Sequence, residues 1–328
     1  MKAIVIKEFG SVDVLQYVDN YSQPVMADNQ VLLKVYAAGI NPLDWKIRQG
    51  QLKALLGSKF PLILGNDASG VVVAVGKLVR DFKVGDEVFC LLDANKRASW
   101  TGFAKSGAYA EYAVTRADTL AHKPKNITHQ QAASIPLAAL TAYQVLMHRA
   151  HIKQGDKVLI NGASGGVGLF ALQIAKALGA NVTAICSERH HHLVLSLGAN
   201  AAIDYKTQDI RHISQKFDVI YDVVANMPFV SYQHLLNPNG VVVSNVVNPM
   251  SLLATQFNPV LKVLGFKKRY TFAWVKASGV DLTQIARLIE RNQLQTFIEQ
   301  SYTLSNIKMA HAHSESGKVQ GKLVLDLT

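Results

Sequence analysis

Hydrophobic and polar positions alternate in short runs over the first third of the chain, and glycines separate the runs. Such alternation is typical of half-buried strands. A longer apolar pattern with helical spacing follows at 129–148, around Pro136. The first third therefore predicts an antiparallel or barrel-like β region with these strands: Ala3–Ile6, Val31–Ala37, Ser69–Val75, Glu87–Leu92 and Ala110–Val114.

From Lys157 the pattern changes to strands that alternate with helices. The predicted helices are Gly166–Leu178 and His190–Leu197, and each is closed by a glycine. This alternation is typical of a parallel sheet covered by helices on both faces. The predicted strands are Lys157–Asn161, Val182–Cys186, Ala201–Tyr205, Asp218–Val224 and Gly240–Val246, followed by a tail with strand Tyr270–Val275, helix Asp281–Arg291 and strand Lys322–Leu327.

Length and composition set the class of protein. A chain of 328 residues predicts two domains, and 49% hydrophobic with 17% charged residues indicates a globular core. No apolar run reaches the ~18 residues of a membrane span, so we expect no membrane partner. The N-terminus is a short alternating strand rather than the apolar segment of a signal peptide, which predicts a cytoplasmic protein.

The charged residues and cysteines narrow the chemistry. The only cysteines, Cys90 and Cys186, form no CxxC pair, which argues against a structural zinc site. The net charge of +11 fits either a solvated basic surface or steering of an anionic cofactor or substrate. Nucleic-acid binding is a third interpretation, but we do not favour it because the basic residues are scattered without interleaved stacking aromatics.

The strongest chemical signal is a glycine-rich turn between a predicted strand and a predicted helix, VLINGASGGVG at 158–168. The glycines allow a tight turn whose backbone N–H groups approach a pyrophosphate, and the helix N-terminus adds a partial positive charge. The alternative is a structural turn without a ligand. We expect a dinucleotide to contact Ser164, Gly165, Gly166 and Val167.

The residues after the second parallel strand predict which dinucleotide binds. NAD sites usually place an acid there for the ribose hydroxyls, whereas this chain has Ser187, with Arg189 two residues on. A hydroxyl and a guanidinium suit the 2′-phosphate of NADPH. Ser187 could instead cap the next helix, with Arg189 on the surface. Tyr205 is a further candidate for the 2′-phosphate or adenine, or else a partly buried strand tyrosine.

Several motifs together resemble the medium-chain dehydrogenase/reductase superfamily, in its zinc-free quinone oxidoreductase branch. They are AGINPLDWKIRQG at 38–50, LGNDASGVV at 64–72, VGDEV at 84–88, GAYAEY at 107–112, LTAY at 140–143, the glycine turn, and ESGKVQGKLVL at 315–325. The resemblance implies an α/β fold in two domains and commonly a homodimer. The expected domains are a Rossmann parallel-sheet domain at 124–269 and a GroES-like, mostly antiparallel β catalytic domain at 1–123 and 270–328.

The resemblance also bears on metal chemistry. The positions that match the ligands of the catalytic zinc in metal-dependent members are Asn41, Asn66 and, less securely, Ala138, and none supplies a thiolate or imidazole. The region matching the structural zinc lobe, 94–107, has no cysteine. The resemblance therefore implies a metal-free reductase that transfers hydride from NADPH to a quinone or an α,β-unsaturated carbonyl.

Candidate catalytic residues follow from the first motif. Asn41 is the expected amide donor beside the nicotinamide, although an Asn before proline also suits a turn. Asp44 could order a neighbour, relay a proton or begin a helix, and Trp45 could line the pocket or fill the core.

Three further segments provide candidate cofactor contacts outside the turn: Thr141 on a helix, Asn245 after the fifth parallel strand, and Lys318 near the C-terminal end. Each of these residues could instead have an ordinary structural role. Lys322 could also reach the cofactor, but as a lysine it is expected to be solvated, and His311 and His313 are expected on the surface. The competing hypothesis is an NADPH-binding protein with weak turnover and a structural or RNA-binding role.

Overall fold

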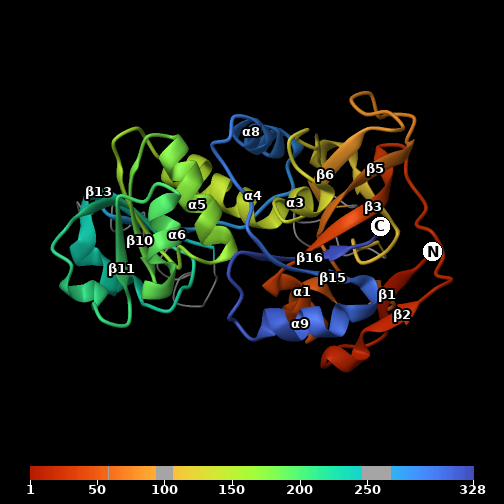
Figure 1. Cartoon of the computed structure of the whole chain (residues 1–328), viewed down its shortest axis with the longest axis horizontal. Coiled ribbons are helices and arrows are strands. Elements are labelled where there is room, and N and C mark those ends of the chain that lie inside the picture. Colours follow the sequence, from red (N-terminus) through yellow and green to blue (C-terminus); the bar gives the residue numbers. More distant parts are fainter. Residues whose placement is uncertain (58, 94–105, 246–266) are drawn as a thin grey trace. The chain divides into compact units, whose positions relative to one another are not determined.

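The computed structural model describes residues 1–57, 59–93, 106–245 and 267–328, and within these the chain forms two compact units (Figure 1). The β-rich unit comprises Met1–Leu140, Lys276–Arg291 and Thr296–Thr328. The α/β unit comprises Thr141–Val275 and Asn292–Gln295. The C-terminal tail thus folds largely with the N-terminal segment.

The α/β unit is built on a parallel sheet of six strands in the order β11-β10-β9-β12-β13-β14. This order places the first strand of the unit, β9, in the middle and defines a Rossmann fold. Helices α5 (Gly166–Ala177) and α6 (His191–Ser196) pack against it. The strands are β9 (Lys157–Asn161), β10 (Asn181–Cys186), β11 (Ala201–Asp204), β12 (Phe217–Asp222), β13 (Leu236–Ser244) and β14 (Arg269–Phe272).

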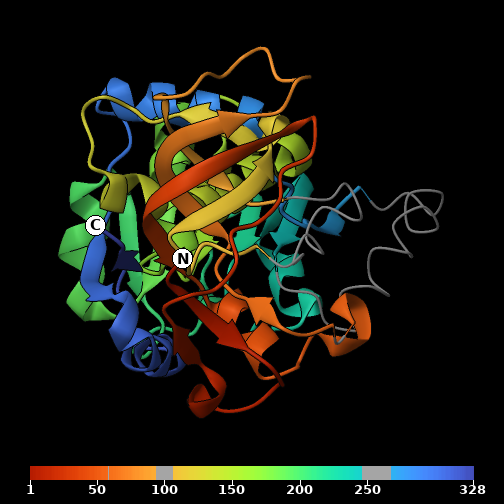
Figure 2. The same cartoon turned by 90° about the vertical axis from the view of Figure 1, so that its right-hand side faces the viewer.

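The β-rich unit contains two mostly antiparallel sheets (Figure 2). The small sheet has the order β2-β1-β4, and the large one β15-β16-β3-β5-β6-β8, with β7 also paired to β3. Their apolar faces form one core. The strands are β1 (Ala3–Ile6), β2 (Gln16–Val18), β3 (Gln30–Ile40), β4 (Leu62–Ile63), β5 (Asp67–Val75), β6 (Glu87–Leu91), β7 (Tyr112–Arg116), β8 (Leu120–His122), β15 (Ile298–Thr303) and β16 (Lys322–Asp326).

Helices complete both units, and within the described residues none is long and apolar enough to cross a membrane. The remaining α-helices are α1 (Pro42–Arg48), α2 (Lys53–Leu56), α3 (His129–Ala133), α4 (Pro136–Gln144), α8 (Gly279–Glu290) and α9 (Ile307–Glu315). Short helical segments of other types are η1 (Val12–Val14), η2 (Ala117–Thr119), η3 (Val145–Ala150, π-helical), η4 (Glu188–His190), η5 (Ile210–His212), η6 (Phe229–Leu235) and η7 (Leu304–Asn306).

Two segments differ from the expectation. The helix predicted at 129–148 is three pieces, because α3 ends before Pro136, which begins α4, and the following turn η3 is π-helical. The tail strand Tyr270–Val275, expected in the catalytic domain, is β14 (Arg269–Phe272) and pairs with β13 in the parallel sheet.

Helix α1 is tied to α9 by a buried arginine. The Arg48 side chain is fully buried and donates to Gly10 O (3.2 Å), His311 Nδ1 (3.1 Å) and the Glu315 carboxylate. A guanidinium only donates, so Nδ1 of His311 must carry the lone pair. Burial and the neighbouring Arg48 charge lower the pKa of His311 to about 3. The expectation that His311 lies on the surface is wrong, since it is fully buried.

This arrangement predicts an acid-sensitive fold. As pH falls below about 6.5 the unfolded chain protonates His311, whereas the folded protein does not until about pH 3. The free energy of unfolding should therefore fall about 1.4 kcal/mol per pH unit more steeply than in a His311→Gln variant. Urea unfolding of both proteins at pH 7, 6 and 5 measures this, and parallel pH profiles would contradict it.

Candidate functional site

The glycine turn after β9 has the geometry of a dinucleotide cradle. Gly162 has a φ of 86°, and a Cβ on Gly168 would lie 2.1 Å from the Gly162 carbonyl oxygen, so the close contact of turn and helix requires glycine. A Cβ on Gly165 would instead meet only that oxygen, at 3.6 Å. The N–H groups of the first turn of α5 have no intrahelical partner. The turn therefore presents open space and donors suited to a pyrophosphate.

The segment after β10 carries the residues predicted to select the cofactor. Ser187 is buried and precedes η4, and its side chain makes no cap hydrogen bond. The exposed Arg189 donates from Nε to Nε2 of the buried His190, at 3.0 Å. This bond leaves both terminal nitrogens of the guanidinium for a ligand. Glu188 is exposed, so the end of β10 holds no buried acid for ribose hydroxyls.

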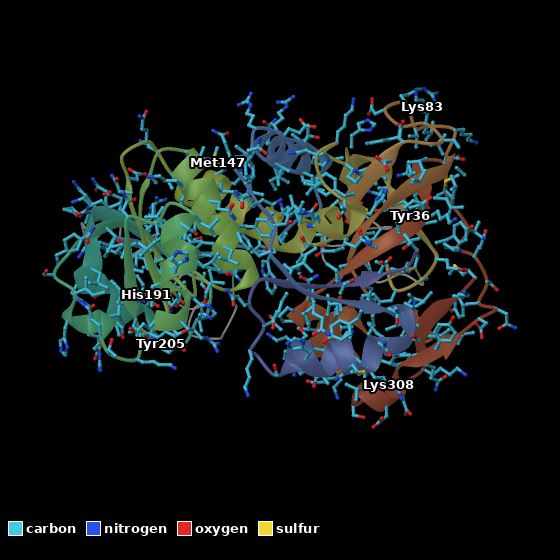
Figure 3. The ribbon with its side chains drawn as sticks, viewed as in Figure 1. Tyr36, Lys83, Met147, His191, Tyr205 and Lys308 are labelled. Atoms are coloured by element: carbon cyan, nitrogen blue, oxygen red, sulfur yellow. The ribbon has the colours of Figure 1, made fainter. Side chains whose placement is uncertain are left out.

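A cavity of about 700 Å³ opens at the carboxyl ends of the parallel strands. Tyr205, labelled in Figure 3, follows β11 and lines it with a ring that is 60% exposed. The wall also includes Lys206, which adds a positive charge, and the ion pair of Arg211 with Asp209. Ligands of open α/β sheets bind at this edge, so the cavity suits the nucleotide end of a cofactor.

The other predicted cofactor residues lie on separate elements. Asn245 follows β13, and its Oδ1 is buried without a hydrogen-bond partner among the described residues. An unsatisfied buried acceptor at this edge suits a hydroxyl or amide of a cofactor. Thr141 is buried on α4 and belongs to the α/β unit. Lys318 is exposed between α9 and β16 in the β-rich unit.

A buried polar cluster in the β-rich unit contains two of the three predicted catalytic residues. Asn41 immediately precedes α1, and Asp44 lies in its first turn. Asp44 Oδ2 accepts from the Asn41 backbone N–H (2.8 Å) and the Tyr109 hydroxyl (3.0 Å), and Oδ1 accepts from Asn66 Nδ2 (2.8 Å). Asp44 is fully buried, so it orders Asn41, Asn66 and Tyr109 rather than meeting solvent.

Burial also affects the ionisation of this cluster. It raises the pKa of Asp44 to about 7, although the hydrogen bonds from Asn41 and Tyr109 act in the opposite direction. Burial likewise raises the pKa of Asp67, and the Lys322 ammonium opposes that shift. Trp45 is half-buried, and its Nε1 has no acceptor among the described residues.

Lys322 contradicts the expectation of a solvated lysine. Its side chain is 5% exposed, its Nζ lies 3.6 Å from Asp67 Oδ2, and it donates to the Asn41 side-chain oxygen. Asp67 and Tyr109 were not singled out from the sequence. An acid that begins an apolar strand directly after Asn66 is the local signal that could have indicated Asp67. A lysine that begins the apolar strand KLVL is the corresponding signal for the burial of Lys322.

The fold and the glycine turn define a dinucleotide-dependent oxidoreductase, and comparison with known proteins agrees. Residues 27–125 match the alcohol dehydrogenase GroES-like domain family, and residues 197–325 match the zinc-binding dehydrogenase family. Over the whole chain, the protein is 35% identical to the mitochondrial NAD(P)H oxidoreductase RTN4IP1 of Bos taurus and covers 89% of that relative.

Two further relatives are informative. The NADPH-dependent alkenal/one oxidoreductase, chloroplastic, of Arabidopsis thaliana is 42% identical over 68% of this chain and 57% of its own length. The solved quinone oxidoreductase from Coxiella burnetii superposes with a TM-score of 0.86 at 34% identity, covering 100% of this chain and 99% of that structure. The chain belongs to the medium-chain dehydrogenase/reductase superfamily, in its quinone-oxidoreductase-like branch. It is an oxidoreductase with a nicotinamide cofactor and a small-molecule substrate.

The names of these relatives also correct the expected location. The cytoplasmic prediction is wrong, because RTN4IP1 is named as mitochondrial and the alkenal/one oxidoreductase as chloroplastic, which points to an organelle. That prediction depended on the lack of an apolar signal segment. Organellar transit peptides are amphipathic and need no such segment, so its lack is no guide to the compartment.

Proposed function

We propose that this oxidoreductase transfers hydride from NADPH to a quinone or an α,β-unsaturated carbonyl without a bound metal. The donor set fits NADPH: the turn at Gly165–Val167 suits the pyrophosphate, Ser187 and Arg189 suit the 2′-phosphate, and Tyr205 suits the adenosine end. Thr141, Asn245 and Lys318 complete the proposed cofactor contacts.

The observation that carries the metal-free part of the proposal is the bonding of Asn41. The family resemblance matches Asn41 and Asn66 to the ligand positions of metal-dependent members, and both side chains are already bonded to protein groups. The Lys322 ammonium contacts Asn41, and a second cation beside it would be repelled. Among the described residues, no three His, Cys, Asp or Glu side chains form a group able to hold a metal ion. Residues 94–105, which belong to the region matched to the structural zinc lobe, lie outside the described residues.

The residues of the cluster suit stabilisation of a substrate oxygen. NADPH supplies a hydride when bound, and hydride addition to a quinone or enone places negative charge on the carbonyl oxygen. Asn41 can donate to that oxygen, which lowers the barrier. Asp44 holds the Asn41 backbone, and Trp45 contributes an apolar face and an N–H that has no acceptor in the described part of the chain. A proton from solvent completes the reduced product.

An acceptor screen tests the reaction class. NADPH absorbance should fall with quinones and enals, and dialysis against EDTA should leave the rate unchanged. Inactivity on every acceptor, together with RNA binding that NADPH competes away, would instead favour the RNA-binding hypothesis. Loss of activity on EDTA treatment with recovery on zinc would contradict the metal-free mechanism.

Arg189→Ala tests the cofactor. A charge-assisted bond to the 2′-phosphate contributes about 1.5–3 kcal/mol, so the Kd for NADPH should rise about 10- to 100-fold. The Kd for NADH should stay within about twofold, because NADH lacks that phosphate. Titration of both cofactors by intrinsic fluorescence measures the ratio. Equal losses for the two cofactors would show that Arg189 does not read the 2′-phosphate.

A further inference from the structure

Three side chains in the buried cluster come from distant parts of the β-rich unit. Asn41 follows β3, Asp67 is the first residue of β5, and Lys322 is the first residue of β16. They are 2%, 0% and 5% exposed. A buried ammonium and carboxylate are costly to desolvate, so stabilisation of the fold alone does not explain why the pair is buried here.

Their bonding fixes the Asn41 amide in one orientation. Asn41 Nδ2 donates to Asp67 Oδ2 at 2.9 Å, and Asn41 Oδ1 accepts from Lys322 Nζ. An ammonium only donates and an ionised carboxylate only accepts, so a flipped amide would lose both bonds. Asp67 is held in turn, because its Oδ1 accepts from the Leu137 backbone N–H at 2.7 Å. The second N–H of Asn41 has no acceptor among the described residues and points in a fixed direction.

The same contacts place the Lys322 ammonium at this position, where burial lowers its pKa and the neighbouring Asp67 carboxylate opposes that shift. Lys322 Nζ touches the oxygen of an amide that occupies a ligand position of metal-dependent relatives. A hydrogen bond from a cation to an amide oxygen polarises the amide and strengthens its N–H groups as donors. In a low-dielectric surrounding this effect is larger than in water.

We propose that Lys322 and Asp67 are positioning residues for the reaction: they aim the free N–H of Asn41 at the substrate oxygen, and Lys322 supplies the fixed positive charge that metal-dependent relatives obtain from their ion. The inference rests on the proposed metal-free function. The pair acts through Asn41 and needs no direct contact with the substrate.

Two variants separate this role from a structural one. Lys322→Met leaves the buried Asp67 without its cationic partner, so it should lower both thermal stability and kcat. Lys322→Met combined with Asp67→Asn removes both charges, so its melting temperature should recover. The kcat of the double variant with NADPH and an enone should stay about 100-fold below wild type, the loss typical of removing a preorganised donor. The Kd for NADPH should change less than threefold.

The outcomes are distinct. A double variant that recovers kcat together with its melting temperature overturns the inference, because the pair would then only stabilise the fold. Wild-type protein that is inactive on every acceptor refutes the proposed function itself. The inference is supported if the wild type is active while the double variant keeps a low kcat and binds NADPH normally.

A second ion pair in the same unit, between the fully buried Arg48 and Glu315, whose side chain is 27% exposed, provides the matched control. Arg48→Met with Glu315→Gln also removes a buried cation and its carboxylate partner. This control should lower stability yet keep kcat within about threefold of wild type at a temperature where it is folded. A comparable fall of kcat in the control would show that any buried charge loss impairs turnover, and it would overturn the specific role of Lys322.

Discussion

Gly165→Val is expected to weaken dinucleotide binding about 100-fold, or ~2.7 kcal/mol, while the fold stays intact. Gly165 has φ −80° and ψ 171°, which a β-branched residue adopts readily, and an added Cβ would meet only the Gly162 oxygen, at 3.6 Å. In the apo protein the side chain therefore enters open space. When the cofactor binds, we expect its pyrophosphate to occupy that space, because the pyrophosphate approaches the backbone at this glycine.

The contrast with a neighbouring glycine sharpens the experiment. A Cβ on Gly168 would lie 2.1 Å from the Gly162 oxygen and 2.7 Å from the Ala163 Cα, so Gly168→Ala should destabilise the apo protein as well. Gly165→Val should leave the melting temperature of the apo protein unchanged. NADPH and NADH share the pyrophosphate, so both should lose affinity equally, unlike in Arg189→Ala. An unaltered NADPH Kd in Gly165→Val would place the cofactor elsewhere.

The regular parts of the fold could be predicted because their signals are local. Strand β9 begins and ends where the apolar run predicts, and α5 begins at the predicted Gly166, after the glycine turn. Helix α9 and strand β15 were not predicted. Both are polar along much of their length. Helix α9 is stabilised by packing onto α1, near the other end of the chain, and β15 by pairing with β16, rather than by their own periodicity.

The residues of the candidate site likewise fall into those that a local pattern predicts and those that depend on distant contacts. The glycine turn and the end of β10 are continuous segments, so spacing alone indicates a dinucleotide there. Lys322 and His311 were expected in solvent because lysine and histidine are usually exposed, and only a specific partner reverses that preference. Those partners lie 281 residues away for Lys322 and 263 for His311, beyond any local pattern. Motif spacing can find a backbone cradle but not a buried charge network.

The buried arginine should have the largest effect on stability. Arg48→Met is expected to lower the free energy of unfolding by about 3–5 kcal/mol, because three acceptors lose their donor and an unsatisfied buried acceptor costs about 1–3 kcal/mol. The methionine fills much of the volume but donates no hydrogen bonds. Glu315, His311 Nδ1 and the Gly10 carbonyl all lose their partner at once. Urea unfolding at pH 7 measures the change.

An exposed arginine pair isolates the contribution of burial. Arg211 is bonded to Asp209 at 2.6 Å with its side chain 67% exposed, whereas Arg48 is 0% exposed. Solvent screens the exposed pair, so Arg211→Met should leave the free energy of unfolding nearly unchanged. The difference between the losses of unfolding free energy in the two variants therefore measures the cost of leaving buried hydrogen-bond partners unsatisfied, rather than the loss of a charge alone. Similar small losses in both would mean that water reaches the Arg48 site and that α1 is held to α9 by apolar packing alone.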